Sequence, residues 1–346
     1  MNLEHQVDQL EELSLLGAEK LQALELADQI AMQVDANQRP DLALRLLIRR
    51  FLAAPHTPDA LAQLATAEAW ASAEGETDLA THIQLLWCRH VGLTDRDAVP
   101  MSVLNEAVEA AQELSILDAE WRLARAAVQP NEGLRLREEA LLHLTSHASA
   151  HDRLLVHLEL AGDRLRGADI AGSLRHLDMA HQIADEHQDP DFICICSSRI
   201  GLHYIERGLS VQAIPYLERA LALATSEDDD LRIVIVATLL STLYLQQDNQ
   251  TAAAHVADLL LVSGARRANW FAVVDGHITR SSLSLMEGDI TAAINRLVRA
   301  ILRLRELVPG AAINILKGRL AELRHELGSA VFDGHYQEAM KANKDV

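Results

Sequence analysis

Small and large apolar residues recur every forty positions in the second half of this chain. Three columns keep that spacing in one register: Ser173, Ala213, Ala253 and Ala293; Leu177, Leu217, Ala257 and Leu297; and Ala140, Ala180, Ala220, Leu260 and Ala300. Repeats of this length indicate stacked helical hairpins, because each hairpin buries its apolar face only against its neighbours. The pattern therefore predicts an all-α fold, an α-solenoid of antiparallel helix hairpins.

Turn-forming residues divide the chain into predicted helices. From residue 131 onward, these are 131–146, 151–166, 170–187, 191–207, 210–225, 230–247, 250–263, 268–286, 289–307 and 311–328. Before them, the residues typical of helix starts are Pro40, Thr57-Pro58, Thr77, Pro100-Met101-Ser102 and Pro130-Asn131. Gly75 and Gly92 are typical of helix ends. With helices near 3–16 and 17–35, the first 130 residues would hold about seven helices.

The repeat register predicts three regions along the chain. Residues 131–328 keep the forty-residue period and form the predicted repeat array. Residues 1–130 keep it poorly, and we interpret them as an acidic helical region of degenerate repeats, with a separate helical cap as the alternative. Residues 329–346 are predicted to form a short final helix and a tail that frays.

The composition supports helices packed closely together. Apolar residues make up 49% of the chain but aromatic residues only 3%, so alanine and leucine supply most of the apolar mass. No apolar run approaches the roughly 20 residues that span a bilayer. The first residues lack the basic start of a secretory signal, and three cysteines are too few for a disulfide framework. We therefore expect a soluble cytoplasmic protein.

The net charge of −19 is unevenly distributed. Residues 1–120 hold 21 acidic and 7 basic residues, a balance of −14, whereas the rest of the chain has a balance of −5. An acidic chain of this kind argues against nonspecific nucleic-acid binding, which needs a basic surface. The charge is compatible with a basic protein partner for the N-terminal part, and it also favours solubility.

One forty-residue unit carries a recognisable signature. It contains Ile200, Gly201, Tyr204 and Gly208, followed by Ala213, Leu217 and Ala220. This spacing resembles the tetratricopeptide repeat, although that repeat usually has about 34 residues. Our hypothesis is a forty-residue variant of this family, with a HEAT-type solenoid as the alternative. In the next unit, Asp248 replaces the turn glycine.

The resemblance implies a binding groove lined by the first helix of each hairpin. By register, the groove positions are Ser198, Leu202, Ile205, Glu206, Thr238, Thr242, Leu245, Gln246, Ile278, Ser282 and Leu285. These residues are small, apolar or weakly polar, and they lack the lysines and asparagines with which some family members clamp a terminal carboxylate. An apolar or amphipathic partner helix or peptide is therefore expected. We expect Leu202, Leu245 and Leu285 to contribute to its binding.

Three arginines form a second candidate site. Arg296, Arg299 and Arg303 share one face of the helix predicted over 289–307, with Arg305 nearby. Guanidinium groups arranged in this way can bind phosphate or a carboxylate-rich segment. The alternative interpretations are a solvated helix face and pairing with the acidic N-terminal half of another copy of the chain.

Two further clusters have plainer interpretations. His143, His147 and His151 follow a four-residue spacing, but no other ligand completes a metal site, so exposed histidines at a helix end are expected. The acidic run 227–230 precedes a predicted helix, where carboxylates cap free backbone amides. The sequence thus predicts no metal site and no cofactor.

The chain contains no phosphate-binding loop, dinucleotide fingerprint, nucleophile elbow or zinc-protease motif. It is therefore predicted to be a non-enzymatic scaffold or adaptor that binds another protein in the groove. The alternative is a regulatory module that senses a ligand or signal peptide, as in a bacterial signalling or transcription system. Self-assembly into a homo-oligomer through the ends of the array is a third hypothesis.

Overall fold

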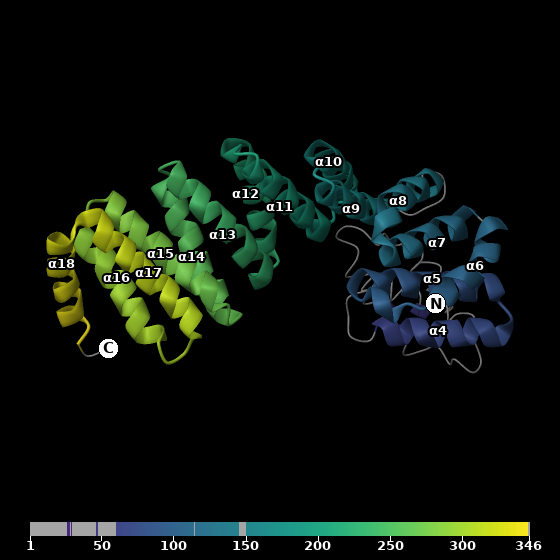
Figure 1. The fold of residues 1–346 in the computed structure, drawn as a ribbon, viewed down its shortest axis with the longest axis horizontal. Helices are drawn as coiled ribbons and strands as arrows, with labels where there is room; N and C mark the ends of the chain where they lie inside the picture. The colour runs from purple at the N-terminus through teal and green to yellow at the C-terminus, as the bar shows by residue number, and fades with distance from the viewer. Residues whose placement is uncertain are drawn as a thin grey trace. The chain divides into compact units, whose positions relative to one another are not determined.

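A computed structural model gives the fold of this chain (Figure 1). It describes residues 26–27, 29, 46–47, 60–113, 115–144 and 150–344. The predicted helix near 3–16 and the predicted helix starts at Pro40 and Thr57-Pro58 lie outside the described residues. Within the predicted helix 17–35, only 26–27 and 29 are described, and these are helical.

The described part of the chain is all-α and contains no strand, which confirms the predicted fold class (Figure 1). Its helices are α4 (Ala60–Glu74), α5 (Thr77–Thr94), α6 (Met101–Glu113), α7 (Ser115–Val128), α8 (Pro130–Leu144), α9 (Ala150–Arg166), α10 (Ile170–Glu186), α11 (Pro190–Glu206), α12 (Ser210–Ser226), α13 (Asp230–Gln246), α14 (Gln250–Arg266), α15 (Trp270–Met286), α16 (Ile290–Leu304), α17 (Gly310–Leu327) and α18 (Ser329–Ala342). A short 3-10 helix, Arg96–Ala98, lies between α5 and α6. Among the described helices, none is both long and apolar enough to cross a membrane.

The chain divides into two compact units, Met1–Cys196 and Ser197–Val346, which we call unit 1 and unit 2. The regions predicted from the repeat register rest on a different criterion, the period of the sequence, and their boundary at residue 130 stays a prediction. Helix α18 occupies most of the segment predicted to form a short final helix.

Several predicted helix ends agree with the structure, but the glycine at position 92 was interpreted wrongly. Gly75 follows α4 with a φ of +79°, a left-handed conformation that suits glycine and ends the helix. Gly92 instead lies inside α5, where a Cβ would sit 3.1 Å from Val128 Cγ2 and 3.2 Å from Ala127 Cβ. It permits close packing of α5 on α7 and does not end a helix.

Two later helix ends also differ from the prediction. Helix α16 ends at Leu304, before the predicted 307, because the chain turns there ahead of Pro309, which begins the next helix. Helix α14 continues to Arg266, past the predicted 263. Its Gly264 packs against α15, where a Cβ would lie 3.1 Å from Ala272 Cβ.

The turns between α9 and α16 repeat one geometry every twenty residues. The residues with left-handed backbone are Ala168, Gln188, Gly208, Asp228, Asp248, Ala268 and Gly288. At five of these turns, the next residue is the N-cap of the following helix, and its side chain accepts a hydrogen bond from a backbone amide there. These capping residues are Asp169, Asp229, Asn249, Asn269 and Asp289. Asp248 thus adopts the conformation of the turn glycine that it replaces. Each repeat contains two such turns, one within the hairpin and one that leads to the next hairpin, so helix pairs recur every forty residues.

The three predicted columns of apolar residues lie in the cores of the two units. All of their members are at most 2% exposed. Small residues occur where helices touch: a Cβ on Gly201 would lie only 2.6 Å from Leu217 Cγ. Alternation of small and large side chains therefore fixes how α11 and α12 pack within their hairpin.

Candidate partner-binding surface

Alternate helices of unit 2 form an inner layer. Helix α13 contacts α15, and α15 contacts α17, whereas the second helices α12, α14 and α16 make no comparable contact with one another. The first helices α13, α15 and α17 therefore lie side by side. Since these helices run in the same direction, residues forty apart lie at corresponding heights on neighbouring helices.

The free face of this inner layer is apolar toward the start of each helix. On α13, Leu231 is 47% exposed and Ile235 is 51% exposed; on α15, Phe271, forty residues after Leu231, is 50% exposed. Ile315 on α17 is 41% exposed and lies eighty residues after Ile235. We call this surface the first-helix face and define it by Leu231, Ile235, Thr238, Thr242, Phe271, Asp275, Ile278, Ser282 and Ile315.

The predicted groove residues lie on the first helices α11, α13 and α15. Those that are exposed are Leu202, Glu206, Thr242 and Gln246. Those that are partly buried are Ser198, Ile205, Thr238, Leu245, Ile278, Ser282 and Leu285. Ile278 and Leu285 also pack against the apolar core formed by α15 to α18, so part of their surface is already used in folding. Their role in partner binding stays a prediction.

The three most exposed apolar residues of this face, Leu231, Ile235 and Phe271, were not among the predicted groove positions. Leu231 and Ile235 precede Thr238 by seven and three residues, which is one face of a helix, and Phe271 precedes Ile278 by seven. The groove prediction used only the later turns of each helix. Extending the same register toward the helix start would have found these residues.

One acidic side chain lies within this apolar face. Asp275 is partly buried on α15, between Phe271 and Ile278 along the helix. Burial raises the pKa of its carboxyl group. Among the described residues, no Lys, Arg or His nitrogen lies within 4.0 Å of this carboxylate and no hydrogen bond to it is formed.

The predicted arginine cluster lies on α16. Arg296, Arg299 and Arg303 are exposed, and no carboxylate of the described residues lies within 4.0 Å of them. The pKa of His277 on α15 is lowered to about 4. Burial is the main cause, and the positive charges of Arg296 and Arg303 add to it. An anion-binding role for the three arginines stays a prediction.

The expectation of exposed histidines agrees with the structure at one position and fails at another, and the acidic loop caps a helix as expected. His143 is exposed and lies 3.4 Å from Asp118, and His147 lies outside the described residues. His151 is buried, 5% exposed, because it packs edge-on against Phe192 in unit 1; the expectation that it is exposed was wrong. Asp229 caps α13 as expected. No group of three or more potential metal ligands occurs within the described residues.

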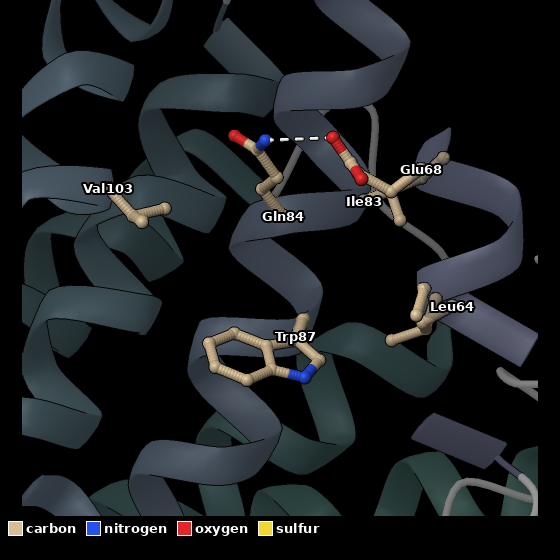
Figure 2. Close-up of a pocket in the computed structure, with 7 residues that line it drawn as sticks. Leu64, Glu68, Ile83, Gln84, Trp87 and Val103 are labelled. Carbon is tan, nitrogen blue, oxygen red and sulfur yellow. Dashed lines mark hydrogen bonds between the residues drawn. The ribbon is translucent and has the colours of Figure 1, made fainter. Parts of the chain in front are cut away.

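Unit 1 contains a small apolar pocket between α4, α5 and α6 (Figure 2). Its volume is about 200 Å³, and its lining residues are Leu64, Ala65, Glu68, Ile83, Gln84, Trp87 and Val103. The Glu68 carboxylate accepts a hydrogen bond from Gln84 Nε2 at 3.1 Å (Figure 2). It also accepts one from Ser72 Oγ at 3.1 Å. Glu68 and Gln84 are thus paired with each other, and most of the other lining side chains are apolar.

Unit 1 also contains a buried network of charges. Glu159 on α9 accepts hydrogen bonds from Arg89 Nη2 on α5 at 3.0 Å and from Arg137 Nε on α8 at 2.6 Å. Arg137 also donates to Asp163 at 2.8 Å, and Arg89 lies 3.6 Å from Glu120 of α7. The two arginines and Glu120 are at most 6% exposed. One polar network therefore connects four helices through the interior of unit 1.

The two glutamates of this network differ in pKa. Burial would raise the pKa of Glu159, but Arg89 and Arg137 outweigh it and lower the value. Burial raises the pKa of Glu120 to about 7, although Arg89 opposes this. Glu120 Oε2 has no hydrogen-bond partner among the described residues. Desolvation therefore dominates at Glu120 and charge pairing at Glu159.

Comparison with known proteins gives a likeness of fold. No protein-family model matches the chain, and no curated protein sequence matches it. The STAND signal-transduction ATPase PH0952 from Pyrococcus horikoshii, which has a tetratricopeptide repeat sensor, is similar in structure with a TM-score of 0.63 and 14% identity. The likeness covers 86% of this chain and 51% of the ATPase, so the chain spans about half the length of that protein.

Two other solved structures are similar over nearly the whole chain. A Rap protein complexed with competence and sporulation factor has a TM-score of 0.50 and 16% identity, with 98% of each chain covered. Aspartyl phosphate phosphatase F from Bacillus subtilis has a TM-score of 0.47 and 14% identity, with 99% of this chain and 92% of that chain covered. The helices and the first two likenesses together show a tetratricopeptide-like helical-repeat solenoid.

Proposed function

We propose that this chain is a non-enzymatic protein-interaction module, which binds an apolar or amphipathic segment of another protein along the first-helix face. The observation that carries the proposal is the alignment of Leu231, Ile235 and Phe271 on two helices in contact, each about half exposed. Single exposed apolar residues are ordinary on a protein surface. Three of them in one register on adjacent helices favour a docking surface.

The geometry of the inner layer suits a bound helix or extended peptide. Neighbouring first helices bring corresponding residues together, so one partner segment can contact several repeats at once. Phe271 has the properties of an anchor for such a segment, since aromatic residues carry a large share of binding energy at interfaces. The later turns add the smaller and weakly polar groove residues, including Thr238, Thr242 and Ser282.

The similar folds support a binding role without naming a partner. The Rap protein is complexed with competence and sporulation factor, and the repeats of the STAND protein are described as a sensor.

Affinity capture with matched variants tests the proposal. The full chain is immobilised and exposed to lysate of its native host, and bound proteins are identified by mass spectrometry. Ile235→Asp and Val262→Asp form a matched pair, because both side chains are 51% exposed but Val262 lies on the second helix α14. We expect a protein that the unmodified chain and Val262→Asp retain at moderate salt, and that Ile235→Asp loses.

Circular dichroism of both variants verifies that each is folded. Leu202→Asp, at an exposed predicted groove position, should also weaken capture. Equal retention by Ile235→Asp and the unmodified chain would contradict the proposed surface. A saturable thermal shift with a small ligand, together with no specific protein capture, would favour the ligand-sensing alternative.

A further inference from the structure

We propose that the partner segment carries a lysine or arginine that pairs with Asp275, between apolar residues that contact the rest of the first-helix face. This inference rests on the proposed function and names the chemistry of the partner. The sequence register and the surroundings of Asp275 are two separate observations that lead to it.

Asp275 interrupts an otherwise apolar row. The residues forty before and forty after it are Ile235 and Ile315, which are 51% and 41% exposed on the neighbouring helices α13 and α17. Along α15 itself, Phe271 lies one turn before Asp275 and Ile278 about one turn after it. The carboxylate is therefore placed among four apolar positions in the docking surface.

The immediate surroundings of Asp275 do not satisfy its charge. Two other acidic side chains of unit 2 have partners: Asp258 accepts from Arg280 Nε at 3.0 Å, and Asp289 accepts from the Ala292 amide at 2.8 Å. Asp275 is partly buried, has no such partner among the described residues, and has a pKa raised by burial. A carboxylate that loses part of its hydration without gaining a partner is less well stabilised, and a bound cation would offset that loss.

The chemistry favours a side-chain cation over a metal ion. A metal needs several ligands that converge on one point, and the described residues offer no such group. A lysine or arginine needs only one carboxylate, and its aliphatic stem can lie along one of the neighbouring apolar residues, Ile235 or Ile315. Docking of the segment would also exclude water and strengthen the pair.

Selection from a random twelve-residue peptide library displayed on phage tests this inference on the full chain. We expect enriched peptides to contain Lys or Arg flanked by apolar residues. Selection on Asp275→Lys should instead enrich Asp or Glu at that place. Binding of each enriched peptide to Ile235→Asp is measured in parallel, because loss of binding there assigns the peptide to the first-helix face.

A double-mutant cycle with one enriched peptide then tests whether its Lys or Arg pairs with Asp275, with the binding affinity as the measured quantity. Asp275→Asn should weaken binding at least about tenfold, and so should replacement of the peptide's Lys or Arg by Gln, while the two changes together should cost little more than one. Asp258→Asn is the control, since Asp258 lies on α14 and is already paired with Arg280. It should leave the affinity unchanged.

The outcomes separate this inference from the proposed function. If Ile235→Asp abolishes binding of the enriched peptides, but these peptides lack a cation or bind Asp275→Asn with unchanged affinity, the proposed pairing is wrong and the proposed docking surface remains supported. Enriched peptides that Ile235→Asp retains would overturn both, as would a selection that enriches no peptide. Thermal unfolding of Asp275→Asn checks that its effect is not a loss of fold.

Discussion

The interiors of the two units are built differently. In unit 1, α5, α7, α8 and α9 are connected by buried arginines and carboxylates around Glu159. In unit 2, the corresponding contacts between helices use glycine and alanine against leucine, as at Gly201 and Leu217. Both solutions occur within one helical-repeat architecture. The comparison shows that a solenoid can join its helices by directional polar contacts or by close apolar packing.

The two solutions should respond differently to mutation. A buried charge without its partner is costly, because the remaining group keeps its desolvation penalty. Close packing instead fails when a side chain becomes too large, and the cost depends on how far its neighbours can move.

Replacement of Arg137 by Met should destabilise unit 1 strongly. Arg137 donates to Glu159 and Asp163, so its removal leaves buried carboxylates with fewer partners. We expect a loss of about 3–5 kcal/mol in the free energy of unfolding. Urea unfolding followed by tryptophan fluorescence reports mainly on unit 1, which contains Trp70, Trp87 and Trp121.

Arg135→Met is the matched control. Arg135 lies on the same helix and also pairs with two carboxylates, Glu132 and Glu139, but it is exposed. Solvent screens such pairs, so its replacement should change stability little. Similar effects of the two replacements would show that the network contributes no more than surface pairs do.

Glu120→Gln should change how stability depends on pH. The folded-state pKa of Glu120 is raised to about 7 from an ordinary 4.5, so the folded state binds more protons between these values than the unfolded state. Stability from this group is therefore present below pH 4.5 and lost as the pH rises toward 7. Relative to Glu120→Gln, the unmodified chain should lose roughly 3 kcal/mol across this window.

Urea unfolding of both proteins at several pH values between 4 and 8 measures this difference. Titrating groups that do not interact with Glu120, including His157 with its pKa lowered to about 4 by burial, cancel in the comparison. Parallel curves for the two proteins would show that Glu120 titrates near its ordinary value in the folded state. A relative gain of stability by the unmodified chain at high pH would contradict the assigned direction.

Gly276→Ala should destabilise unit 2 by a smaller amount. A Cβ at this position would lie 2.9 Å from the Ala257 carbonyl oxygen and 2.9 Å from Leu261 Cγ. Overpacking of this kind costs about 1–3 kcal/mol, which outweighs the gain of about 1 kcal/mol from replacing a helical glycine by alanine. Thermal unfolding followed by circular dichroism should therefore show a lower midpoint.

Gly318→Ala is the opposite case. Gly318 lies within α17 with nothing within 4 Å of the place where its Cβ would be. Only the gain in helix propensity remains, so this replacement should raise the unfolding midpoint. If Gly276→Ala raised it as well, α14 and α15 would be able to separate at no cost, and close packing would not define unit 2.

Features that repeat along the sequence could be predicted from it, whereas features that depend on packing between helices could not. The forty-residue columns and most helix starts were predictable, because periodicity and capping act locally. Gly92 was wrongly interpreted as a helix end because a glycine that permits close packing looks the same in sequence as one that ends a helix. Its role depends on Ala127 and Val128 of another helix.

The charged residues show the same limit. Arg135 and Arg137 are two positions apart on one helix, yet one is exposed and the other is 4% exposed within a network. Nothing in the local sequence distinguishes them, because burial is decided by the helices that pack around α8. Asp275 likewise appears as an ordinary polar residue until its neighbours Ile235 and Ile315 are placed beside it.

The uniform turns of unit 2 have a consequence for how such a chain can grow. Gly208, Asp248 and Gly288 share one backbone conformation and lie forty residues apart. A segment cut at two of these residues has ends of the same geometry, so its tandem duplication would insert one more hairpin without reshaping the joints on either side. Gene duplication could thus lengthen the binding face in steps of one hairpin, and copy number would set the length of partner segment that it accommodates.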